Sequence, residues 1–152
     1  MSLQVGDAAP AFELPNQDRE MVSSDALKGR KSLIVFIPFP FTGICEGELC
    51  MIRDNLTDLG HMDANVVAIT VHAVPTIKAW AEANHFGFSV LSDYWPHGAT
   101  AKAYGAFNET VGAANRHTFV LDENGIVRSI ISTESLGIGR EFDEYTKALS
   151  AI

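Results

Sequence analysis

Cys45 is the residue of this chain whose position best suits covalent chemistry. The apolar run at 33–37, typical of a buried strand, ends shortly before it, and a helix-like run begins near Glu46. At the start of a helix the backbone N–H groups lack intrahelical partners and the helix dipole is positive, so a thiolate is favoured there over a thiol. Because the thiolate is the nucleophilic form of cysteine, this placement indicates redox or nucleophilic chemistry at sulfur.

The elements that must position Cys45 alternate between short apolar runs and helical segments. Strands are expected at about 11–14, 20–22, 32–39, 65–71, 89–91, 117–121 and 126–132, the last two joined by a tight Asn-Gly turn. Helical segments are expected at about 24–27, 44–59 with Gly60 as its stop, 75–86, 99–104 and 141–151. This order predicts an α/β fold with a central mixed β-sheet flanked by helices. It is compatible with a thioredoxin-like fold, although the pattern alone allows other α/β sandwiches.

Length and composition exclude several classes of function. With 152 residues, 47% of them hydrophobic, the chain is expected to form one domain, 1–152. No apolar run approaches the roughly 20 residues that span a bilayer, and the first residues do not resemble a signal peptide. Two cysteines in such a chain predict a cytoplasmic location. The net charge of −8 would repel nucleic acid and anionic membranes, so neither is expected as a partner.

No cofactor or metal is expected either. The histidines show neither H-x-x-x-H nor C-x-x-H ligand spacing. A Gly-rich phosphate loop, a paired-carboxylate site and a Ser-His-Asp pattern are also not recognisable in the sequence. The chemistry is therefore expected to depend on cysteine alone.

Pro38 and Thr42 stand seven and three residues ahead of Cys45, in the pattern P-x-x-x-T-x-x-C. This spacing resembles the active-site signature of the peroxiredoxins, thiol peroxidases with a thioredoxin-like fold. The resemblance extends over nearly the whole chain, through segments 6–12, 91–93, 103–105 and 115–122. Segments 41–45 and 93–98 look closest to the alkyl hydroperoxide reductase E subfamily, whose members are usually described as one-cysteine enzymes.

The resemblance implies roles for the residues that match the family pattern. Thr42 corresponds to the threonine whose hydroxyl contacts peroxide and thiolate, and Pro38 to the proline that shields the site from water. Arg116 corresponds to an arginine before a late strand, and its guanidinium can hold Cys45 as thiolate and polarise the peroxide. Glu48, one helical turn after Cys45, corresponds to an acidic or amide residue that helps orient the arginine. The implied activity is reduction of hydrogen peroxide and organic hydroperoxides through a sulfenic acid on Cys45.

Cys50 departs from the one-cysteine pattern. Its C-x-x-x-x-C spacing from Cys45 resembles the PrxQ (bacterioferritin comigratory) branch, in which the second cysteine resolves the sulfenic acid as an intramolecular disulfide. On an ideal helix such residues lie about 8.6 Å apart at Cα and about 140° apart around the axis. A disulfide needs roughly 7 Å or less. We expect Cys50 to resolve Cys45 after the first turns unwind, which Gly47 makes easier. The alternative is a buried apolar role for Cys50 and resolution by an external thiol.

Two other functions compete with the peroxidase. A thioredoxin-type thiol–disulfide oxidoreductase normally carries C-x-x-C, which this chain lacks. A redox sensor would be oxidised at Cys45 once without turning over. By resemblance we also expect a homodimer, with loops near Phe41 and at 94–97 in the interface. The expected reductant is thioredoxin, a glutaredoxin-like protein or a low-molecular-weight thiol, and the sequence does not distinguish these or the preferred peroxide.

Overall fold

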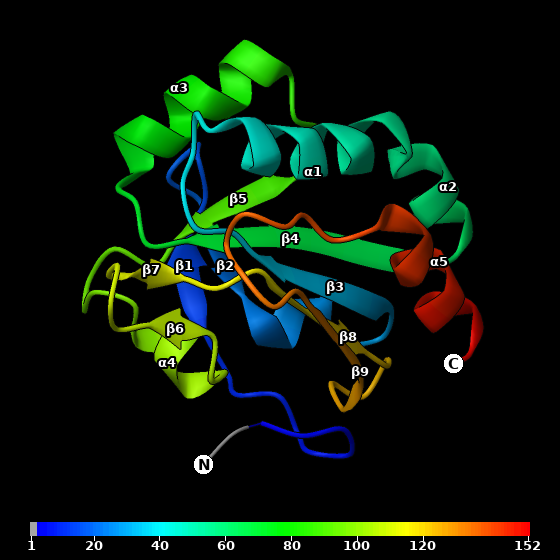
Figure 1. The fold of residues 1–152 in the computed structure, drawn as a ribbon. Helices are drawn as coiled ribbons and strands as arrows, with labels where there is room; N and C mark the ends of the chain where they lie inside the picture. The colour runs from blue at the N-terminus through cyan, green and yellow to red at the C-terminus, as the bar shows by residue number, and fades with distance from the viewer. Residues whose placement is uncertain (1–2) are drawn as a thin grey trace.

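A five-stranded mixed sheet forms the centre of the computed structural model, which describes residues 3–152 (Figure 1). In spatial order its strands are β5 (Ser89–Ser92), β4 (Ala64–Thr70), β3 (Lys31–Phe36), β8 (His117–Leu121) and β9 (Val127–Ser132). Strands β3, β4 and β5 run parallel, whereas β8 is antiparallel to β3 and β9 is antiparallel to β8. The predicted mixed sheet is confirmed, and the strand that precedes Cys45 lies at its middle.

Both faces of β3 are covered, which explains its unbroken apolar sequence. Leu33 and Val35 pack into the core on one face, and Ile34 and Phe36 pack into the core on the other. The first face is covered by α1 (Gly43–Asp54), α2 (Leu56–His61), α3 (Val74–Asn84) and α5 (Phe142–Ser150) (Figure 1). The second face is covered by α4 (Ala99–Ala103) and segments near the N-terminus.

Small elements complete the fold beneath the second face. They are β1 (Glu13–Pro15), β2 (Met21–Ser23), the 3₁₀ turn η1 (Ser24–Leu27), β6 (Phe107–Asn108) and β7 (Ala113–Ala114). The pair β6–β7 was not predicted, because strands of two residues carry no readable periodicity. No helix between residues 3 and 152 is both long and apolar enough to cross a membrane.

The prediction of one continuous helix at 44–59 was wrong. The structure has two helices, α1 and α2, separated at Asn55, whose φ of −114° and ψ of 17° are not helical. The Asn55 side chain donates a hydrogen bond to the Met51 carbonyl at 2.8 Å, a contact that competes with regular helix. Gly60 was expected to stop the helix, but it lies inside α2, which ends at His61.

The predicted strand at 32–39 is also too long, because β3 ends at Phe36. Pro38 and Pro40 follow, and proline has no N–H to donate to a neighbouring strand. The chain therefore leaves the sheet early and crosses to α1 as a loop, which carries Thr42 to the start of the helix.

The position of Gly60 inside α2 yields a stability prediction. Gly60→Ala is expected to raise the free energy of unfolding by up to about 1 kcal/mol, because alanine has the higher helix propensity. An added Cβ would meet no atom within 4 Å. Urea unfolding measures the change, and a loss of stability would show that Gly60 ends the helix after all.

Gly98 provides the contrasting variant. Its φ is +70°, and a Cβ there would overlap the Phe107 ring. Gly98→Ala should therefore lower the free energy of unfolding by more than about 1 kcal/mol.

Candidate active site

Cys45 lies in the first turn of α1, as the sequence predicted. The helix begins at Gly43, and Thr42 is its N-cap, with extended φ and ψ of −113° and 148°. The Cys45 side chain is fully buried, with 0% exposure, although its neighbours from 41 to 44 are exposed. Both cysteines are free thiols. The sulfur therefore sits beneath an exposed helix start, shielded from solvent.

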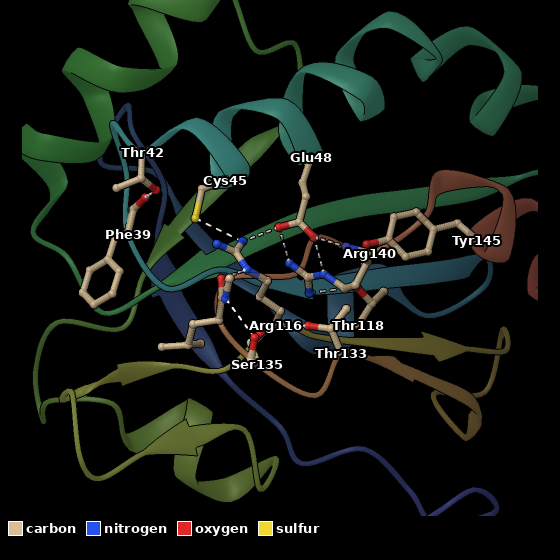
Figure 2. Close-up of polar contacts among 12 residues, drawn as sticks. Phe39, Thr42, Cys45, Glu48, Arg116, Thr118, Thr133, Ser135, Arg140 and Tyr145 are labelled. Atoms are coloured by element: carbon tan, nitrogen blue, oxygen red, sulfur yellow. Dashed lines mark hydrogen bonds and ion pairs between the residues drawn. The ribbon is translucent and has the colours of Figure 1, made fainter.

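Arg116 binds the sulfur. Its Nη1 lies 3.3 Å from Cys45 Sγ and donates to Glu48 Oε1 at 2.6 Å, while its Nε donates to the Leu136 carbonyl at 2.7 Å (Figure 2). Arg116 immediately precedes β8, the strand paired with β3, so the sheet brings it beneath α1. Its side chain is 4% exposed. The structure thus brings together Cys45, Glu48 and Arg116.

A second buried arginine, Arg140, completes the group and was not predicted. Its Nε and backbone N–H donate to Glu48 Oε2 at 2.8 and 2.7 Å, and its Nη2 donates to Oε1 at 3.0 Å. Its Nη1 donates to Thr118 Oγ1 at 3.1 Å, and that hydroxyl lies 2.9 Å from the Tyr145 hydroxyl. Figure 2 shows the carboxylate of Glu48 held between the two guanidinium groups.

The charges of this group leave one positive charge beside the sulfur. Burial alone would raise the pKa of Glu48, but the hydrogen bonds and charge of Arg140, together with the charge of Arg116, lower this pKa below its ordinary value. Burial alone would lower the pKa of Arg140, yet Tyr145, Glu48 and Cys45 raise it. Two guanidinium groups facing one carboxylate leave one positive charge unbalanced, and a Cys45 thiolate would neutralise it.

The remaining predicted site residues lie nearby but do not join this group. Pro38 is buried in the loop after β3. Among the contacts of residues 3–152, the Thr42 hydroxyl has its side-chain hydrogen bond to the Phe39 carbonyl, at 2.6 Å, and not to the sulfur. Cys50 is partly buried on α1, with its Sγ 3.8 Å from Asn84 Oδ1 on α3.

Charge balance is the signal that could have revealed Arg140. A buried Glu48 and a Cys45 thiolate carry two negative charges, and Arg116 supplies one positive charge, so a second cation is required. Nothing in the sequence pattern says that Arg140, just before the last helix, is the residue that supplies it. Within the described part of the chain, no three His, Cys, Asp or Glu side chains are arranged to hold a metal ion.

The lowered pKa of Glu48 predicts a pH-dependent contribution to stability. A carboxyl whose pKa falls on folding stabilises the protein above its unfolded pKa, and this contribution is lost as the pH falls through the folded pKa. At pH 7, Glu48→Gln should lower the free energy of unfolding by about 3 kcal/mol, because buried arginines lose their counter-charge. This difference from wild type should begin to shrink below about pH 4.3, the ordinary pKa of a glutamate, and should disappear only when the pH falls below the lowered pKa of folded Glu48.

Urea unfolding at several pH values tests this expectation. Glu82→Gln, at an exposed position on α3, is the matched control and should change stability little at any pH. A difference between wild type and Glu48→Gln that stays constant down to pH 3 would show that Glu48 is not the titrating group.

Known proteins resemble this chain along its length. Residues 5–130 match the model of the AhpC/TSA family. Alkyl hydroperoxide reductase E of Mycobacterium tuberculosis is 45% identical over 151 residues, 99% of this chain and 98% of the relative. Peroxiredoxin Bcp of Escherichia coli is 28% identical over 134 residues, covering 84% of this chain and 85% of the relative.

Solved structures of peroxiredoxins share the fold of this chain. Peroxidoxin BcpB from Mycobacterium tuberculosis matches with a TM-score of 0.85 at 28% identity, covering 97% of this chain and 95% of its own. Enterococcus faecalis AhpC matches with a TM-score of 0.89 at 26% identity, covering 99% and 92%. The predicted thioredoxin-like fold is confirmed, and a peroxidase that depends on a thiol is the activity to which the family points. With this fold and these relatives, the chain is an enzyme that belongs to the AhpC/TSA family of peroxiredoxins.

Proposed function

We propose that the protein reduces hydrogen peroxide and organic hydroperoxides by direct attack of the Cys45 thiolate. Sulfur bonds to the terminal peroxide oxygen and the O–O bond breaks, which leaves Cys45 sulfenic acid and an alkoxide that takes up a proton to become an alcohol or water. The observation that carries the proposal is the 3.3 Å contact between Cys45 Sγ and Arg116 Nη1, inside a group with one unbalanced positive charge.

Arg116 is the residue that we assign to stabilising the reacting oxygens. Its Nε is fixed on the Leu136 carbonyl and its Nη1 on Glu48, so the guanidinium is oriented before any substrate arrives. Donors that are oriented in advance stabilise developing charge without reorganising, and a single one is worth about 10²–10³ in rate. Glu48 and Arg140 act through Arg116, as positioning residues.

Access to the sulfur requires the loop at 38–42 to move, because Cys45 is fully buried. We assign Thr42 to the role of releasing the Phe39 carbonyl and donating its hydroxyl to the peroxide. Thr42 is exposed and stands directly before the helix, so this exchange needs only a local change. Pro38, buried behind the loop, is assigned to keeping water from the sulfur.

Cys50 is the group that we assign to resolving the sulfenic acid. The Cys50 thiol attacks the Cys45 sulfur, an S–S bond forms, and the sulfenic oxygen leaves as water with the thiol proton. Because α1 is continuous from Gly43 to Asp54, its first turns must unwind before the two sulfurs can meet. Two external thiols, or one dithiol, then reduce this disulfide to two thiols and are themselves oxidised to a disulfide. This recycling fits a reducing cytoplasm.

Stopped-flow oxidation of wild type, Cys45→Ser and Cys50→Ser, followed by mass spectrometry, tests the assignment. Cys45→Ser should lose the rapid reaction with hydroperoxide, because the nucleophile is gone. Cys50→Ser should keep the first oxidation and gain the mass of one oxygen atom as sulfenic acid. Wild type should instead end two hydrogen atoms lighter than the reduced protein, with both free thiols lost.

Three results would contradict the proposal. Rapid peroxide reduction by Cys45→Ser would contradict attack by Cys45. A wild-type sulfenic acid that persists, with Cys50 still open to alkylation, would instead favour resolution by an external thiol. Insulin reduction without peroxide consumption would favour a thioredoxin-type oxidoreductase.

A homodimer is the second part of the proposal. Phe41, Tyr94 and Trp95 are large aromatic residues with exposures of 54%, 55% and 81%, and they lie in the two loops expected at the interface. Side chains of this type are enriched in protein interfaces and are unfavourable in water. We infer that a second copy of the chain covers them.

Analytical ultracentrifugation measures the oligomeric state and so tests this expectation. Wild type should sediment as a dimer at tens of micromolar, and Trp95→Glu should sediment as a monomer, since a buried charge without a partner costs several kcal/mol. Val5→Glu, which replaces an exposed apolar residue near the chain start, is the control and should remain a dimer. A monomeric wild type would contradict the homodimer.

A further inference from the structure

A row of side chains on α1 contacts α3. Glu46, Cys50 and Arg53 have the spacing i, i+4 and i+7, which places them on one face of the helix. Glu46 Oε1 accepts a hydrogen bond from Trp80 Nε1 at 3.0 Å, and Arg53 Nη1 donates to the Asn84 carbonyl at 2.7 Å. Between them, Cys50 Sγ lies 3.8 Å from Asn84 Oδ1. The two helices lie side by side above the sheet (Figure 1).

Cys50 therefore faces away from the sulfur that it is proposed to resolve. Cys45 contacts Arg116 beneath α1, whereas Cys50 contacts Asn84 at the end of α3. On a continuous helix, positions five residues apart differ in direction by about 140°. Disulfide formation therefore has two requirements. Cys50 must break its contact with Asn84, and the first turns of α1 must unwind.

The atom of Asn84 that contacts Cys50 suits a thiol better than a thiolate. Asn84 Nδ2 already donates to the Trp80 carbonyl at 3.0 Å, so Oδ1 is the atom presented to the sulfur. An amide oxygen accepts a hydrogen bond from a thiol but repels a thiolate. Asn84 is also the last residue of α3, where the helix dipole is negative and disfavours an anion. The guanidinium of Arg53, bound to the Asn84 carbonyl, opposes this effect, so the side-chain amide of Asn84 is the group on which the inference rests.

We propose that Asn84 is a positioning residue that holds Cys50 on α3 as a thiol and thereby limits the rate at which Cys50 resolves the Cys45 sulfenic acid. The inference rests on the proposed function, because it concerns the step assigned there to Cys50. Slower resolution by Cys50 would prolong the lifetime of the Cys45 sulfenic acid, so that an external thiol could react with it. A second hydroperoxide can also oxidise it to sulfinic acid, with release of an alcohol or water.

The first test measures disulfide formation after a single turnover with hydrogen peroxide. Wild type, Asn84→Ala and the control Glu82→Ala are quenched at intervals with an alkylating agent, and sulfenic acid and disulfide are counted by mass spectrometry. Relative to the sulfenic acid formed in the same sample, Asn84→Ala should form disulfide roughly two- to tenfold faster, the equivalent of one net hydrogen bond. At excess peroxide it should form less sulfinic acid. Glu82→Ala, at an exposed position of the same helix, should match wild type.

The second test separates the chemistry of the contact from simple loosening of the helices. In a Cys45→Ser background, Cys50 is the only thiol, and its alkylation by iodoacetamide is followed against pH. Asn84→Ala should move the profile to lower pH, and Asn84→Asp should move it to higher pH, because a carboxylate repels the thiolate more strongly than an amide. A purely structural role would move both variants in the same direction.

The outcomes distinguish this inference from the function on which it rests. Wild type that forms sulfenic acid but no disulfide would overturn resolution by Cys50, and this inference with it. Disulfide formation at equal rates in wild type and Asn84→Ala would overturn the inference alone. So would alkylation profiles that do not move in opposite directions.

Discussion

The buried carboxylate of Glu48 is the interaction on which the site depends. It accepts hydrogen bonds from Arg116 and Arg140, which come from segments far apart in the sequence. Each guanidinium would be costly to bury without this counter-charge, so the carboxylate ties α1 to the strand edge of β8 and to the start of α5. Two guanidinium groups on one carboxylate also leave one positive charge that is not balanced, next to the sulfur of Cys45. In the proposed function, the stability of the fold and the reactivity of Cys45 therefore depend on the same group of charges.

The sequence predicted most of the fold because the sheet is built from readable apolar runs. Strand β3 alternates between two buried faces, and the runs that became β4, β8 and β9 were each recognisable alone. The break at Asn55 was not predictable in the same way. It depends on the Asn55 side chain, which donates to the Met51 carbonyl one turn earlier, and an isolated asparagine within an otherwise helical pattern does not reveal this choice.

The sequence predicted those parts of the candidate site that depend on the spacing of neighbouring residues. It did not predict the contacts between residues that are distant in the sequence. The spacing of Thr42 and Cys45 is a property of one turn, and Arg116 was found through its resemblance to a family pattern. The pairing of Arg140 with Glu48 joins positions whose relation only the folded chain defines. The same is true of the contact between Cys50 and Asn84, because periodicity assigned each residue to a helix without saying which helices would touch.

The pair of hydroxyl groups on Thr118 and Tyr145 links the last helix to this chemistry. Arg140 donates to Thr118, Thr118 lies against Tyr145, and the carbonyl of Leu149, one turn further along α5, is held by Lys31 Nζ from the sheet. Helix α5 is thus linked through a chain of hydrogen bonds to the group of side chains around Cys45. A substitution that displaces α5 would therefore also displace Arg140, and through Glu48 it would alter how Arg116 is held against Cys45.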